Sequence, residues 1–271
     1  MARKSIFELE KRIDVLDETR NLISFLNKED TFSWNNHYNE SFISMVNYYF
    51  PSWSYKKSAL SCQQYFELYG IDIHRLTEES CLYLLEFLLN ICSWIPAQIE
   101  YRSSFSSFRD RNEQLIYGIE TSINSILEGM NYKAKKVKDK VLIYKRNADV
   151  DSTIGLTSNS DLATLLLQYL DFRNQNSVIE KGSILASLNI WIEKNKDEYK
   201  KINNQLYKDV SAIINNIGSR HKENMDPPLT RKEKLYWMDN CFHLMLYLIR
   251  SVELKSIQNE LNEVFKPRIS N

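Results

Sequence analysis

The residues whose types and spacing most directly suggest chemistry lie in the stretch INNIGSRHKEN, residues 214–224. An apolar helical face ends there at Ile217, and after Gly218 the residues Arg220 and His221 stand side by side in the sequence. An arginine guanidinium can hold a phosphate through paired hydrogen bonds, and a histidine can exchange a proton near neutral pH. The pair therefore fits a phosphate site, and it also fits a polar helix end where cations offset the helix dipole.

A second candidate surface is the densest run of cations, between residues 132 and 147, which Tyr132 and Tyr144 flank. Cations beside stacking rings suit a nucleic-acid or partner surface, whereas lysines on a β-hairpin also prevent edge-to-edge pairing. Both interpretations stay open. The candidate residues are Lys133, Lys135, Lys136, Lys138 and Lys140.

Metal and cofactor motifs are missing from the sequence. The four histidines are scattered, and no histidine or cysteine pair has the spacing of zinc ligands. Neither GxxxxGK[ST] nor GxGxxG occurs, so no glycine-rich phosphate loop is expected. We expect no metal and no cofactor. The cysteines lie among apolar residues, which predicts buried free thiols and suits a reducing cytoplasm: Cys62, Cys81, Cys92 and Cys241.

Composition narrows the class of protein. Lys plus Arg and Asp plus Glu both total 35 of 271 residues, so a global basic field for nucleic acid or acidic lipid is excluded. The longest apolar run, residues 82–95, is shorter than the roughly 20 residues that a bilayer span needs. The N-terminus lacks the apolar stretch of a signal peptide. We expect a cytoplasmic protein without a membrane span.

Apolar residues recur at helical spacing along most of the sequence, so the elements that position the candidate residues are expected to be mainly helices. The segment 78–95 is apolar on most sides, which predicts a central helix that starts at the N-cap Thr77 and stops before Pro96. Glu86 is the exceptional acid in that segment and is expected to face solvent or a partner group. The predicted helices are 5–28, 58–69, 78–95, 110–129, 161–173, 178–200, 202–217 and 230–263. In the last one, the residues expected to face inward are Tyr236, Trp237, Cys241, Leu244, Met245, Leu248 and Val252.

Alternation replaces the helical pattern in residues 132–147, with a turn expected at residues 138–140. Because an isolated hairpin is marginally stable, we expect it to dock on helices. The fold class is therefore mainly α, an irregular multi-helix bundle with one small β-hairpin. The aromatic stretch 31–58 is expected to pack several rings against the body of the protein: Trp34, Phe42, Tyr49, Phe50 and Trp53.

Three stretches of the C-terminal half resemble the HEPN superfamily, helical proteins found in bacterial abortive-infection and related defence systems. They are LLLQYLDFRNQNSVIEKGSILASLNIWIE (165–193), NNIGSRHKEN (215–224) and WMDNCFHLMLYLIRSVE (237–253). Their order is similar to that superfamily, in which helices bundle around a polar Arg/His motif. The predicted hairpin, an insertion over 131–147, separates an N-terminal helical region over 1–130 from a C-terminal region over 148–271, for which the resemblance implies a HEPN-like bundle. The chain can also form one continuous domain.

Active members of that superfamily are metal-independent RNases, often dimers whose motifs face each other, with four to six residues between an Arg and the His that follows it. For His221 this places the Arg at Ile214, Asn215 or Asn216, so the motif is not intact. The resemblance then implies a non-catalytic interaction module of a bacterial anti-phage defence or toxin–antitoxin type system. Its partner would be another protein or a second copy, with a homodimer expected.

Two alternatives stay open. A metal-independent endoribonuclease acting on RNA would use Arg220 and His221 with Asn215 or Asn216. An immunity or adaptor protein unrelated to that superfamily would need none of these residues.

Overall fold

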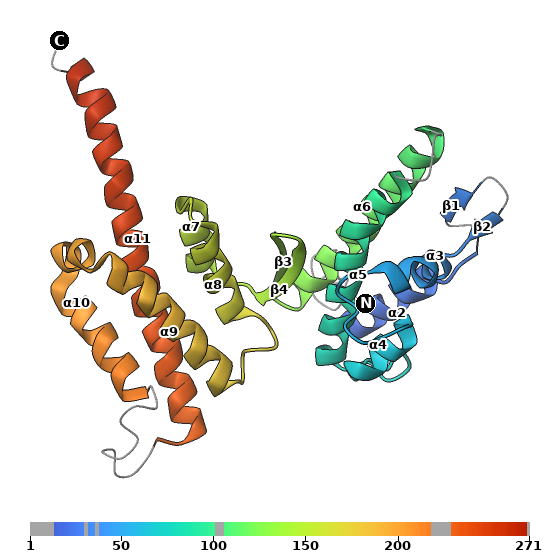
Figure 1. Ribbon diagram of the computed structural model, residues 1–271, viewed down its shortest axis with the longest axis horizontal. Helices are drawn as coiled ribbons and strands as arrows, with labels where there is room; N and C mark the ends of the chain where they lie inside the picture. The colour runs from blue at the N-terminus through green and yellow to red at the C-terminus, as the bar shows by residue number, and fades with distance from the viewer. Residues whose placement is uncertain (1–13, 30–31, 36–37, 101–105, 218–228, 270–271) are drawn as a thin grey trace, which may run out of the picture. The chain divides into compact units, whose positions relative to one another are not determined.

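The computed structural model describes residues 14–29, 32–35, 38–100, 106–217 and 229–269, and within these ranges the chain is mainly α-helical (Figure 1). The predicted fold class is confirmed. The chain forms two compact units, unit 1 from Met1 to Ile143 and unit 2 from Tyr144 to Asn271. The boundary falls inside the second strand of the predicted hairpin.

Unit 1 is built around one long helix, α5. Its elements are α2 (Val15–Leu26), β1 (Phe32–Asn35), β2 (Tyr38–Glu40), α3 (Phe42–Tyr49), the 3₁₀ turn η1 (Phe50–Ser52), α4 (Cys62–Leu68), α5 (Glu78–Glu100), α6 (Ser106–Gly129), β3 (Tyr132–Val137) and β4 (Lys140–Lys145). Helices α2, α3 and α6 pack against α5. From Cys81 to Ile95, most side chains of α5 are buried, as expected for a central helix. The predicted cap is also present, since Ser80 N donates to Thr77 Oγ1 at 3.2 Å.

Aromatic side chains fill the space between α5 and the segments before it. Phe42, Tyr49, Phe50 and Trp53 are buried, which confirms that part of the prediction, and the side chain of Trp34 lies outside the described residues. The ring of Phe87 lies 5.5 Å from that of Trp53. Edge-to-face arrangements at such distances add to the apolar area that the rings bury.

The predicted hairpin is confirmed, because β3 and β4 pair as neighbours around residues 138–139. Helix α5 covers the outer edge of β4. Val141 N donates to Asn90 Oδ1 at 2.9 Å, and Asn90 Nδ2 donates to the Val141 carbonyl at 3.0 Å. One turn earlier, Glu86 Oε2 accepts from Ile143 N at 3.3 Å. Glu86 thus faces a partner group, and an amide and a carboxylate take the place of a further strand.

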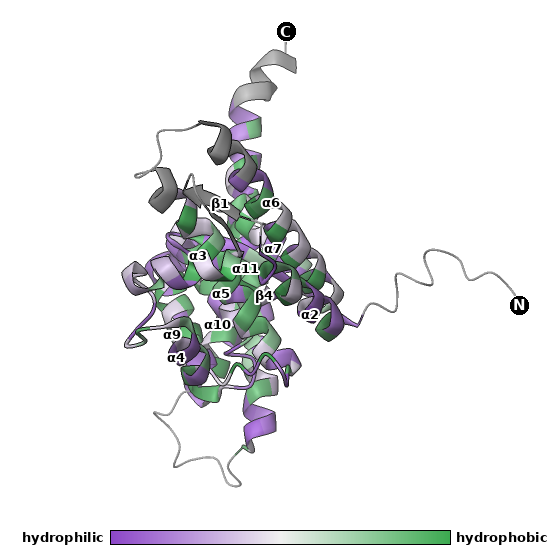
Figure 2. Ribbon diagram, turned by 90° about the vertical axis from the view of Figure 1, so that its right-hand side faces the viewer, coloured by the Kyte–Doolittle hydropathy of each residue, from purple (hydrophilic) through white to green (hydrophobic). Residues whose placement is uncertain are grey.

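Unit 2 is a helical bundle of α7 (Ala148–Leu156), α8 (Ser160–Leu170), α9 (Val178–Lys194), α10 (Lys196–Ile217) and α11 (Arg231–Ile269). Its core joins α8, α9, α10 and α11, with Leu166, Leu188, Val210 and Met245 all fully buried. In Figures 1 and 2, the C-terminal part of α11 continues past the other helices of the unit.

Several boundaries differ from the sequence prediction. A continuous helix over 5–28 is wrong at Asp14, which has extended backbone angles and caps α2 by accepting from Leu16 N and Asp17 N. Helix α5 runs through Pro96, although a proline removes one helical hydrogen bond. The chain also turns at Asn203, whose non-helical backbone lets its side chain cap Leu206 N at 3.0 Å.

Several elements were not predicted, among them helix α3 in the aromatic stretch. Helix α7 is short and begins at Asn147, whose side chain accepts from Asp149 N and Val150 N. Strands β1 and β2 form a second antiparallel pair in the aromatic stretch, so the described chain has two hairpins where one was expected.

Candidate functional site

The Arg/His pair cannot be placed, because Arg220 and His221 lie outside the described residues. Asn215 and Asn216 are exposed in the last turn of α10. The ribonuclease set therefore stays a prediction.

The lysines of the hairpin are mostly exposed, with Lys133 half-buried. Several of their contacts lie within unit 1. Lys136 Nζ donates to Ser93 Oγ at 2.8 Å, and Lys140 Nζ lies 4.3 Å from the centre of the Tyr55 ring. The Tyr55 hydroxyl in turn donates to the Asp139 carboxylate. These contacts favour a structural role for this part of the run.

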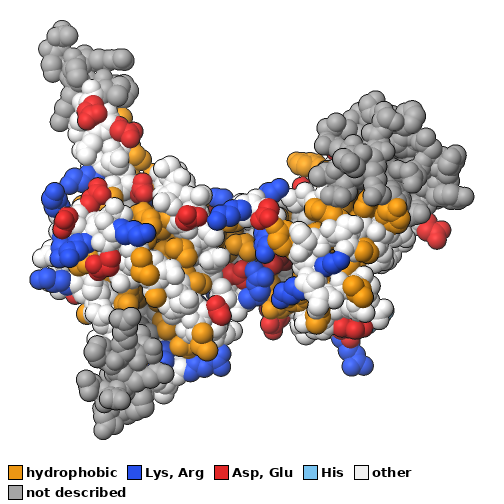
Figure 3. Space-filling model, viewed as in Figure 1, with side chains coloured by type: hydrophobic (Ala, Val, Ile, Leu, Met, Phe, Trp, Pro, Cys, Tyr) orange, Lys and Arg blue, Asp and Glu red, His pale blue; other side chains and the backbone are white. Residues whose placement is uncertain are grey.

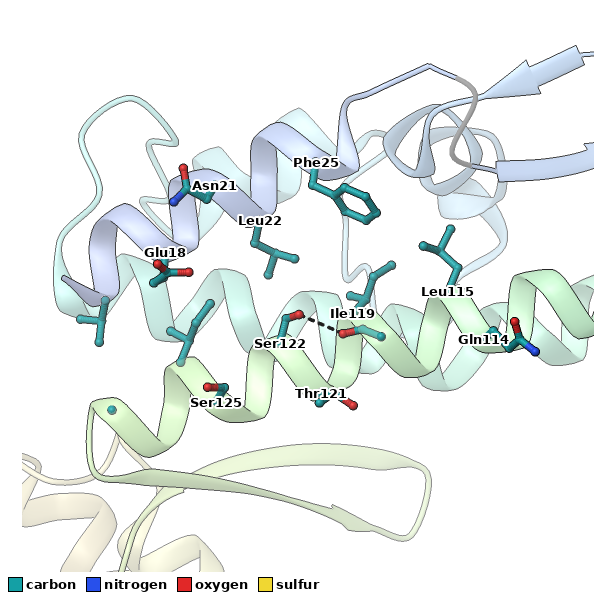
Figure 4. Close-up of a pocket in the computed structure, with 14 residues that line it drawn as sticks. Glu18, Asn21, Leu22, Phe25, Gln114, Leu115, Ile119, Thr121, Ser122 and Ser125 are labelled. Carbon is teal, nitrogen blue, oxygen red and sulfur yellow. Dashed lines mark hydrogen bonds between the residues drawn. The ribbon is translucent and has the colours of Figure 1, made fainter. Parts of the chain in front are cut away.

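A groove of about 890 Å³ runs between α2 and α6 (Figure 4). Its floor contains the buried side chains of Leu22, Ile119 and Ile126. Phe25, which is 38% exposed, lies on the α2 side, opposite the half-buried Leu115 of α6. The groove is therefore apolar along its base and open to solvent above it.

Small residues line the α6 side of this groove. Gly118, Ser122, Ser125 and Gly129 recur at helical spacing, and a Cβ added at Gly118 would meet no atom within 4 Å. Ser122 Oγ donates to the Gly118 carbonyl at 3.0 Å, so this hydroxyl is already satisfied within α6 (Figure 4). An apolar partner could cover such a hydroxyl without leaving a donor unpaired.

A polar cluster lies inside unit 2, where α8, α9 and α11 meet. Lys181 Nζ lies 2.6 Å from Asp239 Oδ1, which also accepts from the Tyr169 hydroxyl at 2.9 Å. The Lys181 side chain is only 7% exposed, while that of Asp239 is 48% exposed. The Lys181 ammonium also lies 4.9 Å from the centre of the Tyr169 ring, which stacks on Phe242 at 3.9 Å.

The surroundings of Tyr169 keep its hydroxyl protonated. Burial, and then the nearby Asp239 carboxylate, raise the pKa of Tyr169 well above its ordinary value. Tyr169 is therefore a hydrogen-bond donor to Asp239 rather than a base or nucleophile. The cluster fits a partly buried ion pair, with Lys181 buried and Asp239 half exposed, that fixes the packing of three helices.

The thiols are also unsuited to nucleophilic chemistry. All four cysteines are free and buried, as predicted. Burial raises the pKa of Cys62 and of Cys241 to about 12. Since the thiolate is the reactive form, these side chains stay unreactive near neutral pH.

An exposed apolar stripe marks the face of α11 opposite the core of unit 2. We call it the outer stripe, and it consists of Tyr236, Tyr247, Leu254, Ile257 and Leu261, which are 37–62% exposed. The prediction that Tyr236 and Trp237 face inward is wrong, because both are exposed. Every residue from Leu254 to Glu263 is exposed on this continuing helix. Figure 3 shows hydrophobic side chains among charged ones on this unit.

Sequence reasoning missed both the groove and the outer stripe. The seven-residue spacing of Tyr247, Leu254 and Leu261 was a visible signal for the stripe. Nothing in the sequence signalled the groove, whose two walls lie about 90 residues apart.

Within the described residues, no group of His, Cys, Asp and Glu side chains is arranged to hold a metal ion, and no helix has the length and apolarity to cross a membrane. The chain matches no protein-family model, no curated protein and no solved structure.

Proposed function

We propose that the protein is a HEPN-like, non-catalytic interaction module of a cytoplasmic bacterial defence or toxin–antitoxin type system, which works as a homodimer through the outer stripe. The observation that carries the proposal is the outer stripe itself. Tyr236 and Tyr247 lie on the solvent side of a part of α11 that buries its other face, and Leu254, Ile257 and Leu261 continue the stripe where the helix is exposed all round. Exposed apolar side chains in such a row favour a protein contact. The three stretches of the HEPN resemblance all fall within unit 2, which also carries this stripe.

A second copy suits the stripe for two reasons. The first is the repeat, since Tyr247, Leu254 and Leu261 are seven residues apart and Ile257 lies three residues after Leu254. This is the spacing with which two helices interlock along a seam. The same stripe on another copy presents the same repeat.

The second reason is area. From Tyr236 to Leu261 the stripe extends over roughly 38 Å of helix. If its five side chains each cover on the order of 100 Å², two copies bury roughly 1,000 Å², which is at the lower limit for a specific interface. The expected homodimer is therefore one that dissociates on dilution.

The test is the double variant Leu254→Glu/Leu261→Glu, measured by size-exclusion chromatography with light scattering over a range of concentrations. The unaltered chain should change from about twice its 32.1 kDa mass toward the monomer on dilution. Two buried glutamates in the seam should weaken association by at least about 30-fold, the equivalent of one interface hot spot.

The matched control is Ser256→Glu/Asn259→Glu, which adds the same charge on the opposite face of the same exposed segment. It should leave the association unchanged. A chain that is monomeric at all concentrations, or a control that dissociates equally, would contradict the homodimer. Metal-independent cleavage of single-stranded RNA, lost in His221→Ala, would instead support the ribonuclease alternative.

A further inference from the structure

The groove between α2 and α6 has the size of a half-embedded helix. Its α6 wall extends from Gln114 to Gly129, which is roughly 22 Å of helix. A volume of about 890 Å³ over that length corresponds to a cross-section of roughly 40 Å², about half that of a helix 10 Å wide. A helix of about 15 residues would therefore fill the groove and keep its other half in solvent.

The walls of the groove suit contact with an apolar helical face. Along α6 the hydroxyls of Thr121 and Ser122 already donate to carbonyls one turn earlier, at 2.8 Å and 3.0 Å, so covering them leaves no donor unpaired. A Cβ added at Gly118 would meet no atom within 4 Å, which leaves room for another backbone to approach this wall closely. Covering Phe25, which is 38% exposed, would remove apolar surface from water.

One end of the groove is acidic. A Cβ added at Gly129, the last residue of α6, would lie 3.2 Å from Val15 Cγ1, so the end of α6 meets the start of α2. Glu18 lines the groove at this end, and the exposed Glu128 directly precedes Gly129. Helix α6 has no basic residue in its last turn, so the negative end of its dipole adds to these carboxylates, whereas Asp14 caps the positive end of α2. This end of the groove therefore favours a cation.

The other end of the groove is apolar, because Phe25 of α2 lies there opposite Leu115 of α6 (Figure 4). Among the described residues that line the groove, Glu18 alone is charged. We infer that the groove binds an amphipathic helix of another protein, which lays an uncharged apolar face on the floor and places a lysine or arginine beside Glu18. Such a helix complements the acidic end and buries no unpaired charge along the rest of the groove. This inference goes beyond the proposed function, since it concerns unit 1 and does not depend on the homodimer.

The test is fluorescence anisotropy with the full chain and a labelled amphipathic peptide of about 15 residues, with leucines at helical spacing on one face and two lysines at one end. A matched peptide carries glutamates in place of the two lysines. The lysine peptide should bind at least about tenfold more tightly, because its charges attract the acidic end and the glutamates repel it. Glu18→Gln should weaken binding of the lysine peptide by roughly threefold, whereas Glu113→Gln, an exposed acid of α6 that does not line the groove, should not.

A second variant locates the peptide in the groove. Gly118→Leu should fill the space beside α6 and weaken binding by at least about tenfold, whereas Gly155→Leu, an equally unobstructed helical position in α7, should leave it unchanged. No binding of the lysine peptide, equal binding of the two peptides, or binding that Gly118→Leu leaves unchanged would overturn the proposal. Conversion of a dimer into a monomer by Gly118→Leu in size-exclusion chromatography would show that a second copy occupies the groove, and would overturn it as well.

Discussion

The central helix of unit 1 and the long last helix of unit 2 are used in opposite ways. In unit 1, α5 is covered on nearly every side by helices, aromatic rings and the hairpin, and even its polar residues Glu86 and Asn90 bond to β4. In unit 2, α11 buries one face and leaves the outer stripe exposed. A helix enclosed like α5 mainly stabilises its unit, whereas a helix like α11 can stabilise a unit and bind a partner with different faces.

The largest effect should come from the buried face of α11. Phe242→Ala removes a ring that is 1% exposed and stacked on Tyr169, so unit 2 should lose about 3–5 kcal/mol of unfolding free energy. Urea unfolding monitored by hydrogen exchange of unit 2 peptides measures this loss. Tyr247→Ala, on the outer stripe, serves as the control and should change stability by less than about 0.5 kcal/mol. Similar losses in both variants would contradict a division of α11 into two faces.

The next effect tests the ion pair of unit 2. Asp239→Ala leaves the Lys181 ammonium buried without its carboxylate, and should cost about 2–3 kcal/mol, less than for a fully buried pair because Asp239 is half exposed. Lys181→Met keeps the packing and removes the charge, so it should cost less than about 1.5 kcal/mol. Urea unfolding compares the two variants. Equal losses of unfolding free energy in the two variants would show that the unpaired charge of Lys181 is not what destabilises Asp239→Ala.

A smaller effect should follow from opening the edge of β4 in unit 1. Asn90→Ala leaves both backbone groups of Val141 without the side-chain partner, which should cost about 1–3 kcal/mol. The exchange of the Val141 amide with solvent should become faster, as NMR can measure. Ser93→Ala, one turn along α5, is the control and should leave that exchange unchanged. Unaltered exchange in Asn90→Ala would mean that α5 does not protect this edge.

The smallest effect concerns the start of α11. Hydrogen bonds from the Thr230 hydroxyl and backbone hold the pKa of Glu233 below its usual range. Because the pKa of Glu233 is lower in the folded than in the unfolded protein, its hydrogen bonds to Thr230 stabilise the start of α11 fully at pH values above the unfolded pKa of about 4.3. This stabilisation is lost as the pH falls through the folded-state pKa. An NMR titration should therefore place the Glu233 midpoint lower than in Thr230→Ala. Identical midpoints would exclude the capping box.

Much of the fold could be predicted because a long, regular hydrophobic pattern is compatible with only one type of secondary structure. The apolar stretch of α5 and the alternation of β3 and β4 are such patterns. Helix α7 was missed because its nine residues mix apolar and polar types. The cap at Asn147 and the packing of α7 against α11 and α8 stabilise this helix. The break at Asp14 was missed because an aspartate within a continuing apolar periodicity does not by itself end a helix.

The features that bear on function also include some that the sequence predicts and some that it does not. The sequence by itself determined that the protein is mainly helical, where its hairpin lies, that its thiols are buried and that α11 carries apolar residues at a heptad spacing. Periodicity predicted correctly that Cys241, Met245, Leu248 and Val252 face the core, but it could not say that Tyr236 and Trp237 lie outside this face, since apolar residues on both faces repeat with a helical period. The tertiary structure decided that, and it also decided that α2 and α6 diverge enough to leave a groove. Such a space depends on packing between segments distant in sequence, and no local pattern records it.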